Sequence, residues 1–524
     1  MKSKQATTYL VTMPPPTPNG GLHLGHLAGP FLAADAFAKA MMERGDTAHV
    51  VSFSDSNQSY VRATAEKQDV DPTELASGWS KDIVETLDTY GCTLDQYFEP
   101  NSETNEYCRA LFLDLYDKGL LKRKAYPFFY SKKRGEFMDE AGVSGLCPQC
   151  LDNCKCGICE HCGHINDANT LLLPYDTNSP DLSLDIHNVD VLVLELETWR
   201  NQLKEFHDNN ENIRPKYKWL VDEALSKPLP DFPISVPGNW GIAMEHPHFP
   251  DQFLNAWPEI LTNFMYEYET FETKNAIDSM RIVNFFGYDN SYFYAVVHVA
   301  LLFAFGKENY LPYSTMTNEF YNLEQEKFST SRNHVVWAKD IAKETLPDKV
   351  RLYAALSGPG YEKSNFSKKE MDKVIDNRFV EPWNYVAQKV NEITAQIDST
   401  DRLPAISSDA TELVAAVANR ASKYYEIEHF SLRESSETIM GFLPAISHYI
   451  DSAKHTDKPL QIMADIAAVL DAYVGVLTPI APVLASRIGG NAKAIRAGAR
   501  MCSGADLFRH KACERASERS IELV

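Results

Sequence analysis

The sequence has 524 residues, of which 44% are hydrophobic and 23% charged, and its formal net charge is −21 at pH 7. This length exceeds what one hydrophobic core serves, so it predicts roughly three or four domains of a soluble globular protein. The negative charge excludes a protein that binds nucleic acid with its whole surface, so any such contact must rest on local basic patches. We find neither the apolar core of a signal peptide nor an apolar run long enough to span a bilayer, so we expect a cytoplasmic protein without a membrane partner.

Residues 8–37 combine a short apolar run, a Pro/Asn/Gly turn and a segment with apolar residues at helical spacing. We interpret them as a strand, a phosphate-binding loop and a helix. The first amides of a helix lack intrahelical partners and carry partial positive charge, so they bind anions. His23 and His26 project the same way and can donate hydrogen bonds to phosphate oxygens, while Gly25 lets a flat base approach the backbone. The alternative is a helix cap that carries two surface histidines.

Residues 49–53 predict a second buried strand, which ends shortly before Asp55. Strand, helix and strand in this order indicate a right-handed parallel unit of Rossmann type, with its ligand crevice at the carboxyl ends of the strands. Asp55 would lie at that edge, where it can pair with an ammonium group. The alternative is an ordinary turn aspartate.

Residues 118–134 contain seven basic residues, no acidic ones and an interleaved aromatic run at 126–130. Basic charge beside exposed aromatic rings suits phosphates and unpaired bases of RNA. A solvated hairpin explains the same pattern equally well.

Six of the ten cysteines lie between residues 147 and 162. In a reducing compartment such crowding indicates a metal before disulfides. Two C-x-x-C pairs, separated by eight residues, place four thiolates tetrahedrally around a structural zinc ion and leave no open position for a substrate. A reactive dithiol, another metal or no metal are the alternatives, and Cys154 and Cys156 in the intervening loop complicate the choice of ligands. We prefer the outer pairs, Cys147, Cys150, Cys159 and Cys162. His161 and His164 are weaker candidates.

Three further segments follow along the chain. Residues 281–294 predict a strand, a glycine turn with Gly287 and Asp289, and an aromatic helix start, and residues 327–332 form a Ser/Thr-rich loop that begins at Lys327. From residue 339 onward, apolar residues recur every three or four positions, which predicts a helical bundle. We expect its helices at residues 349–356, 369–394, 412–425, 432–449 and 460–487.

Taken in order, the stretch PNGGLHLGH, the paired cysteines, the G-x-D turn and the loop KFSTS resemble the class I aminoacyl-tRNA synthetases, and most of all the methionyl branch. The resemblance implies an α/β catalytic domain, a split Rossmann-type parallel sheet with a zinc-knuckle insertion, followed by an all-α bundle. The implied catalytic residues are His23, His26 and Lys327. The implied ATP-binding residues are Thr17, Asn19, Gly25, Gly287, Asp289, Ser329 and Ser331.

The resemblance also implies domain boundaries. Residues 1–129 and 261–340 would be the two halves of the catalytic domain, and residues 130–260 the inserted domain. A segment that contacts the tRNA stem would follow at 341–368 and a helical anticodon-binding domain at 369–490. Residues 491–524 would form a basic tail.

The chain departs from the family in the amino-acid pocket. Asp55 matches the aspartate that holds the substrate amino group, but Phe253 and Ile260 replace a tryptophan and a tyrosine, and Tyr294 replaces a histidine. The pocket stays apolar and aromatic, which suits a thioether, although the polar contacts to the sulfur have changed. The implied amino-acid-binding residues are Met13, Asp55, Phe253, Ile260, Phe293 and Tyr294.

Two further departures concern the loop and the bundle. Thr330 replaces the second lysine of the loop, which predicts slow or differently tuned adenylation. Tyr385 and Lys389 stand where the family reads the methionine anticodon with an asparagine and an arginine.

We therefore expect an enzyme that uses ATP, with its Mg²⁺, to adenylate an amino acid, methionine being the best single choice, and that transfers the acyl group to tRNA. One alternative is a paralogue that adenylates methionine or another amino acid for an unusual tRNA or a non-tRNA acceptor in specialised metabolism. A catalytically silent tRNA-binding or scaffold protein is another. The sequence leaves the oligomeric state open.

Overall fold

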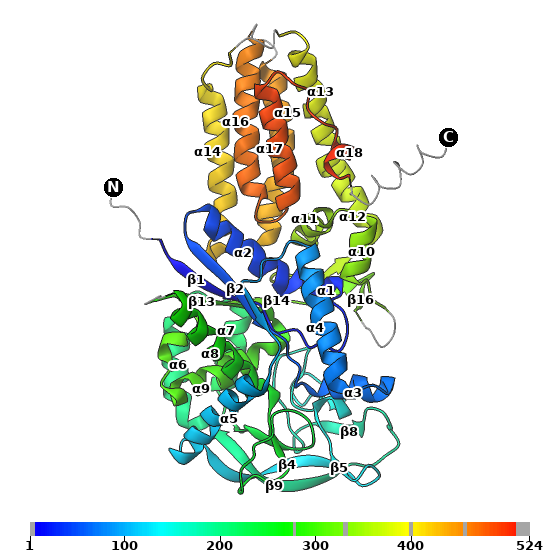
Figure 1. The fold of residues 1–524 in the computed structure, drawn as a ribbon, viewed down its shortest axis with the longest axis vertical. Coiled ribbons are helices and arrows are strands. Elements are labelled where there is room, and N and C mark those ends of the chain that lie inside the picture. Colours follow the sequence, from blue (N-terminus) through cyan, green and yellow to red (C-terminus); the bar gives the residue numbers. More distant parts are fainter. Residues whose placement is uncertain (1–5, 276–278, 329–333, 398–401, 454–457, 510–524) are drawn as a thin grey trace.

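The computed structural model of the chain describes residues 6–275, 279–328, 334–397, 402–453 and 458–509. Figure 1 shows the helical bundle at one end of the molecule, the long strands β4 and β9 of the insertion at the opposite end, and the central parallel sheet between them.

The elements follow one another in four groups. The first half of the sheet domain contains β1 (Thr8–Thr12), α1 (Leu24–His26), η1 (Leu27–Phe31), α2 (Leu32–Glu43), β2 (Thr47–Phe53), α3 (Ser59–Gln68), α4 (Pro72–Thr89), β3 (Gln96–Phe98) and α5 (Ser102–Asp117). The insertion contains β4 (Lys122–Ser131), β5 (Glu136–Phe137), η2 (Glu140–Gly142), β6 (Val143–Leu146), β7 (Asn153–Lys155), β8 (Leu172–Asp176), β9 (Asp185–Glu195), η3 (Leu196–Trp199), α6 (Arg200–Asn209), α7 (Pro215–Leu225), β10 (Asp231–Pro233), β11 (Ser235–Pro237) and β12 (Gln252–Leu254).

The second half of the sheet domain and the connection to the bundle contain α8 (Ala256–Asn275), β13 (Arg281–Gly287), η4 (Tyr288–Asn290), η5 (Phe293–Val297), α9 (His298–Phe305), η6 (Glu308–Tyr310), β14 (Ser314–Asn318), β15 (Tyr321–Leu323), β16 (Glu326–Lys327), α10 (Ala338–Glu344), α11 (Pro347–Ser357) and β17 (Ser364–Phe366). The bundle contains α12 (Lys368–Ile375), η7 (Asp376–Val380), α13 (Glu381–Thr394), α14 (Ser408–Lys423), η8 (Ile427–His429), α15 (Leu432–Ala453), α16 (Pro459–Leu477), α17 (Pro482–Arg496) and α18 (Gly504–Leu507).

The central sheet has the strand order β14-β13-β1-β2-β3, and all its pairs are parallel. β1 pairs with β2 on one side and with β13 on the other, so the sheet joins two segments that flank the insertion. The predicted split Rossmann-type sheet is therefore confirmed, as are the insertion and the helical bundle. The carboxyl ends of β1, β2 and β13 meet at one edge, which is where ligands bind in such sheets.

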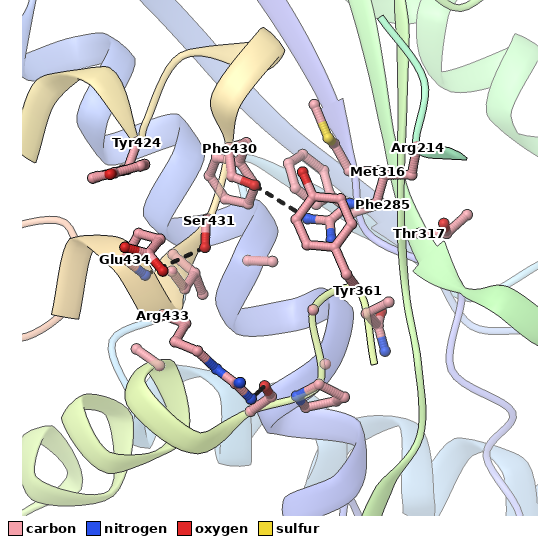
Figure 2. Close-up of a pocket in the computed structure, with 18 of the residues that line it drawn as sticks. Arg214, Phe285, Met316, Thr317, Tyr361, Tyr424, Phe430, Ser431, Arg433 and Glu434 are labelled. Atoms are coloured by element: carbon pink, nitrogen blue, oxygen red, sulfur yellow. Dashed lines mark hydrogen bonds between the residues drawn. The ribbon is translucent and has the colours of Figure 1, made fainter. Parts of the chain in front are cut away.

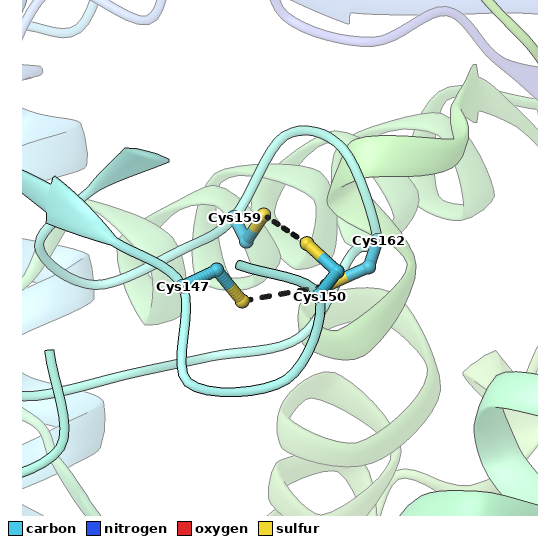
Figure 3. Close-up of side chains that lie close together, drawn as sticks. All are labelled: Cys147, Cys150, Cys159 and Cys162. Carbon is cyan, nitrogen blue, oxygen red and sulfur yellow. Dashed lines mark hydrogen bonds between the residues drawn. The ribbon is translucent and has the colours of Figure 1, made fainter. Parts of the chain in front are cut away.

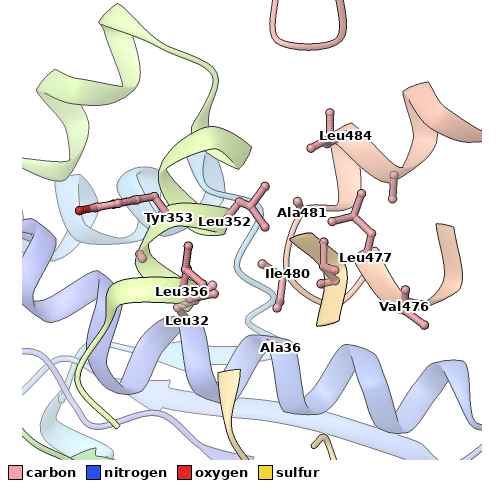
Figure 4. Packing of buried hydrophobic residues seen from close by; sticks show 14 of the residues in the cluster. Leu32, Ala36, Leu352, Tyr353, Leu356, Val476, Leu477, Ile480, Ala481 and Leu484 are labelled. Carbon is pink, nitrogen blue, oxygen red and sulfur yellow. The ribbon is translucent and has the colours of Figure 1, made fainter. Parts of the chain in front are cut away.

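The sheet is buried on both faces, as expected of parallel strands covered by helices. Successive side chains of β1 alternate between two core clusters: Val11 belongs to the first and Leu10 to the second. The first cluster continues through α2 and α11 into the bundle. Figure 4 shows part of it, where Leu32 of α2, Leu352 of α11 and Ile480 before α17 come together.

A buried ion pair crosses the junction between the sheet domain and the bundle. Nη2 of Arg351, on α11, lies 2.6 Å from Oδ2 of Asp35 on α2, and both side chains are fully buried. The guanidinium also donates to the carbonyls of Tyr90, Pro479 and Ile480 at 3.1, 3.0 and 2.6 Å. A buried charge is tolerated when it is paired and hydrogen-bonded in this way.

Two expectations about helices need correction. The helix predicted over residues 24–37 is broken into α1, η1 and α2 at Gly29, which has a non-helical backbone because the residue before a proline avoids the helical region. The single helix expected at residues 460–487 is two helices, α16 and α17. Pro482 at the first turn of α17 lacks the N–H that would have continued α16.

One helix of the described residues, α16, is long and apolar enough to cross a bilayer by length and composition alone, although we expected no such run. It passes this test because it is a central helix of the bundle: side chains such as Ile466, Leu470 and Tyr473 are fully buried in the first core cluster. Asp465 within it accepts hydrogen bonds from Ser407 and Gln461 at 2.7 and 3.0 Å.

Replacement of Asp35 by alanine would remove the carboxylate that pairs with the buried Arg351 guanidinium and also with Lys39. We expect Asp35→Ala to lower the free energy of unfolding by about 3–5 kcal/mol, measured by urea-induced unfolding followed by circular dichroism. Glu437→Ala is the matched control, since its partner Arg378 and Glu437 itself are 39% and 43% exposed and such pairs contribute under about 1 kcal/mol. Equal losses in the two variants would refute this role of the buried pair.

Candidate active site and metal centre

The two histidines lie at the start of the helix that follows β1. His23 caps α1, and its Nδ1 accepts a hydrogen bond from the His26 amide at 3.3 Å. The two rings stack with centroids 3.6 Å apart, so they face the same side. His26 is exposed, whereas burial and then the neighbouring His26 lower the pKa of His23 well below its ordinary value. His23 is therefore neutral near pH 7 and can contact an anion by hydrogen bonding.

The loop that begins at Lys327 lies against this histidine pair. The ring of Phe328 stacks on that of His23 with centroids 4.8 Å apart, nearly parallel at 7°. On the far side of residues 329–333, the Leu24 amide donates to the Val336 carbonyl at 3.0 Å. Both flanks of the loop thus contact residues 23–26, which we call the histidine element. Ser329, Thr330 and Ser331 of the loop lie outside the described residues.

Gly25 allows this close packing. A Cβ at position 25 would lie 2.9 Å from two atoms of the His23 ring and 3.2 Å from Cδ2 of Phe328. Any other residue would force the histidine or the phenylalanine away. The structure therefore gives Gly25 a packing role in addition to the base contact that the sequence suggested.

Lys327 and Asp289 both lie near the carboxylate of Glu160. The Lys327 ammonium forms an ion pair with Glu160, which lies between two of the clustered cysteines. Burial, then the nearby Glu160, raise the pKa of Asp289 to about 7. A Cβ on Gly287 would lie 2.5 Å from Oδ1 of Asp289, so the glycine makes room for this carboxylate. The G-x-D turn, Lys327 and the cysteine module therefore share one surface.

The turn after β1 reaches the end of β2. The Thr17 hydroxyl donates to Oδ2 of Asp55 at 3.2 Å, and the Asp55 amide donates to the Pro16 carbonyl at 3.1 Å. Asn19 follows in the same turn, with its amide 2.9 Å from the Thr17 carbonyl. Asp55 is only 6% exposed, so it is more than an ordinary turn aspartate.

Two more acidic residues surround Asp55. Burial, followed by the charges of Glu259 and Glu140, raises the pKa of Asp55 well above its ordinary value. Glu259 is 3% exposed; its Oε1 accepts hydrogen bonds from Asn57 and Asn263 at 2.8 and 3.2 Å, and its Oε2 has no partner among the described residues. A cation between these carboxylates would relieve their mutual repulsion.

Aromatic side chains lie next to the three acids. Trp257 stacks on Phe293 with centroids 3.8 Å apart and donates through Nε1 to Oε2 of Glu140 at 2.8 Å. Tyr294 stacks on Phe286 at 3.9 Å.

The six residues expected to bind the amino acid do not all share one environment. Ile260, Phe293 and Tyr294 belong to the second core cluster, whereas Met13 belongs to the first. Phe253 is partly exposed on β12. The structure thus brings Asp55 near the aromatic cluster but packs Met13 with the other core.

The four outer cysteines come together as the spacing predicts (Figure 3). All four Sγ atoms lie within 4.8 Å of one another, and the Cys147–Cys162 and Cys150–Cys159 sulfur atoms are 3.7 and 3.6 Å apart. Tetrahedral zinc with bonds of about 2.3 Å requires sulfur atoms roughly 3.8 Å apart. The cysteines therefore fit a zinc ion, which would stabilise the module without reaching a substrate, and the cluster does not include Cys154 or Cys156.

The basic run at residues 118–134 forms β4 and its flanks, and β4 pairs with the acidic strand β9. Five of its seven cations form ion pairs with carboxylates, so this surface offers RNA less positive charge than its sequence alone suggests. The pairs are Lys118–Asp114, Arg123–Asp190, Lys124–Glu195, Lys124–Asp231, Lys132–Asp185 and Arg134–Asp176.

The sequence analysis missed Glu140, Glu160, Trp257, Glu259 and Phe328. Glu259 had a usable signal: with Asn263 and Glu267 it forms a polar row at four-residue spacing in α8, and all three side chains are buried. The other four had none, because their positions depend on contacts between the insertion, the loop and the sheet.

Comparison with known proteins gives a consistent result. A family model described as "tRNA synthetases class I (M)" matches residues 9–390. The methionine–tRNA ligase of Roseiflexus sp. (strain RS-1) is 26% identical over 465 residues, 84% of this chain and 78% of that protein, and that of Roseiflexus castenholzii is 27% identical over 440 residues, 78% and 72%. The Mycobacterium tuberculosis methionyl-tRNA synthetase bound by methionyl-adenylate has a similar fold, with a TM-score of 0.74 at 17% identity over 95% of this chain and 98% of that one.

We expect the purified protein to contain about one zinc ion per chain, because the four sulfur atoms have the spacing of a closed tetrahedral site. Cys150→Ser should remove most of this zinc, measured by atomic absorption, and make the insertion more sensitive to proteolysis. Cys156→Ser is the control, since Cys156 lies in the same loop but outside the cluster. Equal zinc content in wild type and Cys150→Ser would contradict the ligand assignment.

Proposed function

The chain belongs to the class I tRNA synthetases of the methionyl type, and from this membership we propose that it adenylates an amino acid with ATP and transfers the acyl group to tRNA. The observation that supports the proposal most directly is the contact between the histidine pair and both flanks of the Lys327 loop, because these two segments resemble the nucleotide-binding motifs of the family.

The residues of this surface suit the steps of adenylation. The amino-acid carboxylate attacks the α-phosphorus of ATP, the bond to the leaving pyrophosphate breaks, and the acyl group of the adenylate then passes to a tRNA 3′-terminal hydroxyl. His23 and His26 would donate hydrogen bonds to phosphate oxygens, and Lys327 would neutralise charge on the pyrophosphate. Mg²⁺ would accompany the ATP. Lys327 must leave Glu160 to do this.

The remaining residues would hold the two substrates. We propose that Gly287 and Asp289, with Thr17, Asn19 and Gly25, bind the nucleotide. The Asp55 carboxylate would hold the amino group of the amino acid. Methionine is the first substrate to test, since the matched relatives are methionine–tRNA ligases and the aromatic rings at 253, 293 and 294 suit a thioether.

Removal of one histidine tests the adenylation site. In ATP–pyrophosphate exchange with methionine, we expect His26→Ala to lower the rate roughly 10²–10³-fold, the usual effect of losing one donor to a developing charge. His248→Ala is the matched control, because His248 is also exposed but lies on the insertion, bonded to Tyr116 at 2.9 Å. Unchanged exchange in His26→Ala would remove this histidine from the mechanism.

A second candidate function is activation of an amino acid whose side chain carries an amine. The buried acids around Asp55 favour it, since the amino group of the amino acid needs one carboxylate and the site provides Glu140 and Glu259 as well.

The bundle favours an unusual acceptor of the acyl group. Tyr385 donates to the Asp451 carboxylate at 2.7 Å, and Lys389 is paired with Glu392 at 3.0 Å. Both residues at the anticodon-reading positions are thus engaged within the bundle.

Substitution of Glu259 separates the two candidates. The same exchange assay is run with methionine, ornithine and lysine. The second candidate predicts that wild type exchanges faster with ornithine or lysine than with methionine. It also predicts that Glu259→Gln lowers the rate with the amine-bearing substrate tenfold or more, because a charge-assisted contact disappears. Glu267→Gln, which alters another buried acid of α8, is the control. Preference for methionine in both wild type and Glu259→Gln would leave the first candidate and eliminate the second.

A further inference from the structure

A cavity lies behind the histidine element, between the sheet domain and the bundle (Figure 2). Its volume is about 490 Å³, within the range of sites for small molecules. The residues that line it come from the helix kink at Gly29 and the start of α2, from β13 and β14, from the end of α11 with residues 358–362, and from the segment that joins α14 to α15. Arg214, which precedes α7, enters it from the insertion.

Arg214 is the most unusual residue of this cavity. It is 8% exposed, yet its Nε and Nη1 atoms have no hydrogen-bond partner among the described residues. Its Nη2 donates to the Phe430 carbonyl at 3.4 Å, and its guanidinium lies over the ring of Tyr361, 4.2 Å from the centroid. No carboxylate oxygen of the described chain pairs with it, so the structure holds a buried cation without a counter-charge.

Such a cation is costly unless an anion joins it. Taking a charged group out of water costs several kcal/mol, and a neutral side chain of similar size avoids this cost. The other buried arginine of the junction shows the usual solution, since Arg351 is matched by Asp35 at 2.6 Å. The contrast between Arg351 and Arg214 points to a partner for Arg214 beyond the described part of the chain.

The rest of the cavity indicates what that partner looks like. Phe285, Met316 and Phe430 give it apolar walls, and Oδ1 of Asn318 is a buried acceptor without a partner in the described structure. Charges of both signs, Lys423 and Arg433 with Glu362, Glu428 and Glu434, line it as well. An oxyanion attached to an apolar body would satisfy the guanidinium and fill the walls.

We propose that this cavity binds a small organic oxyanion, a carboxylate or a phosphate ester on an apolar body, with Arg214 as its charged contact. None of the residues that we assign to the proposed adenylation site lines this cavity, although Ala28 and Gly29 of its wall lie two and three residues after His26. A ligand there would therefore rest against the helix that carries the histidine pair.

Binding by isothermal titration calorimetry tests the proposal, with 3-phenylpropionate and phenyl phosphate as probes and 3-phenylpropanol as the uncharged control. We expect one or both oxyanions to bind the wild-type protein and to bind Arg214→Gln on the order of tenfold or more weakly. Binding of 3-phenylpropionate alone identifies a carboxylate site, and binding of phenyl phosphate alone a phosphate-ester site. The alcohol should not bind.

Three further variants distinguish this site from its rivals. His26→Ala should retain the binding, which excludes the ATP site as its location. Ala33→Phe should block the binding by filling the cavity from α2 while leaving Arg214 in place. Arg214→Met should melt at the wild-type temperature or above it, whereas a purely structural arginine would lower the melting temperature when removed. Equal affinity in wild type and Arg214→Gln, equal binding of the alcohol, or no binding of either oxyanion overturns the proposal.

Discussion

The ion pair between Asp35 and Arg351 is the constraint on which the arrangement of the domains depends. It joins α2, the continuation of the histidine helix, to α11, and the same guanidinium holds the carbonyls at the start of α17. Arg351 is planar, and its five donors point in fixed directions, so satisfying them fixes the relative position of three segments. Apolar packing alone is less directional, and the first core cluster by itself would tolerate sliding of the bundle against the sheet.

This constraint also fixes the active-site surface. The segment at Leu22 and Leu24 pairs with Val336 and Ala338, immediately before α10, and the chain then enters α11 with Arg351. The histidine helix is therefore held at its start by the flank of the loop and further along by the ion pair. The kink at Gly29–Pro30 lies between these two contacts and forms part of the wall of the cavity that contains Arg214.

The sequence predicted those features that follow from local patterns. The alternation of strands and helices predicted the parallel sheet, and the two C-x-x-C pairs, together with the family pattern that they resemble, predicted the cysteine cluster. It did not predict the buried acids around Asp55 or the unpaired Arg214, since burial of a polar side chain depends on neighbours far away in the chain. It also missed the break between α16 and α17, where the apolar period continues across Pro479 and Pro482 and masks the turn.

Glu160 connects the cysteine module to the proposed nucleotide site through Lys327, and the strength of this ion pair decides what the contact can do. Lys327 and Glu160 are 53% and 47% exposed, and an ion pair in such surroundings contributes about 0–1 kcal/mol. A contact this weak cannot keep Lys327 from a triphosphate, whose greater charge offers the ammonium a stronger partner. It can nevertheless keep the lysine near the histidine pair before ATP arrives, because Phe328 beside it is stacked on His23. The insertion thus contributes to the proposed active site through the position of Glu160, and a shift of the cysteine module would first displace Lys327.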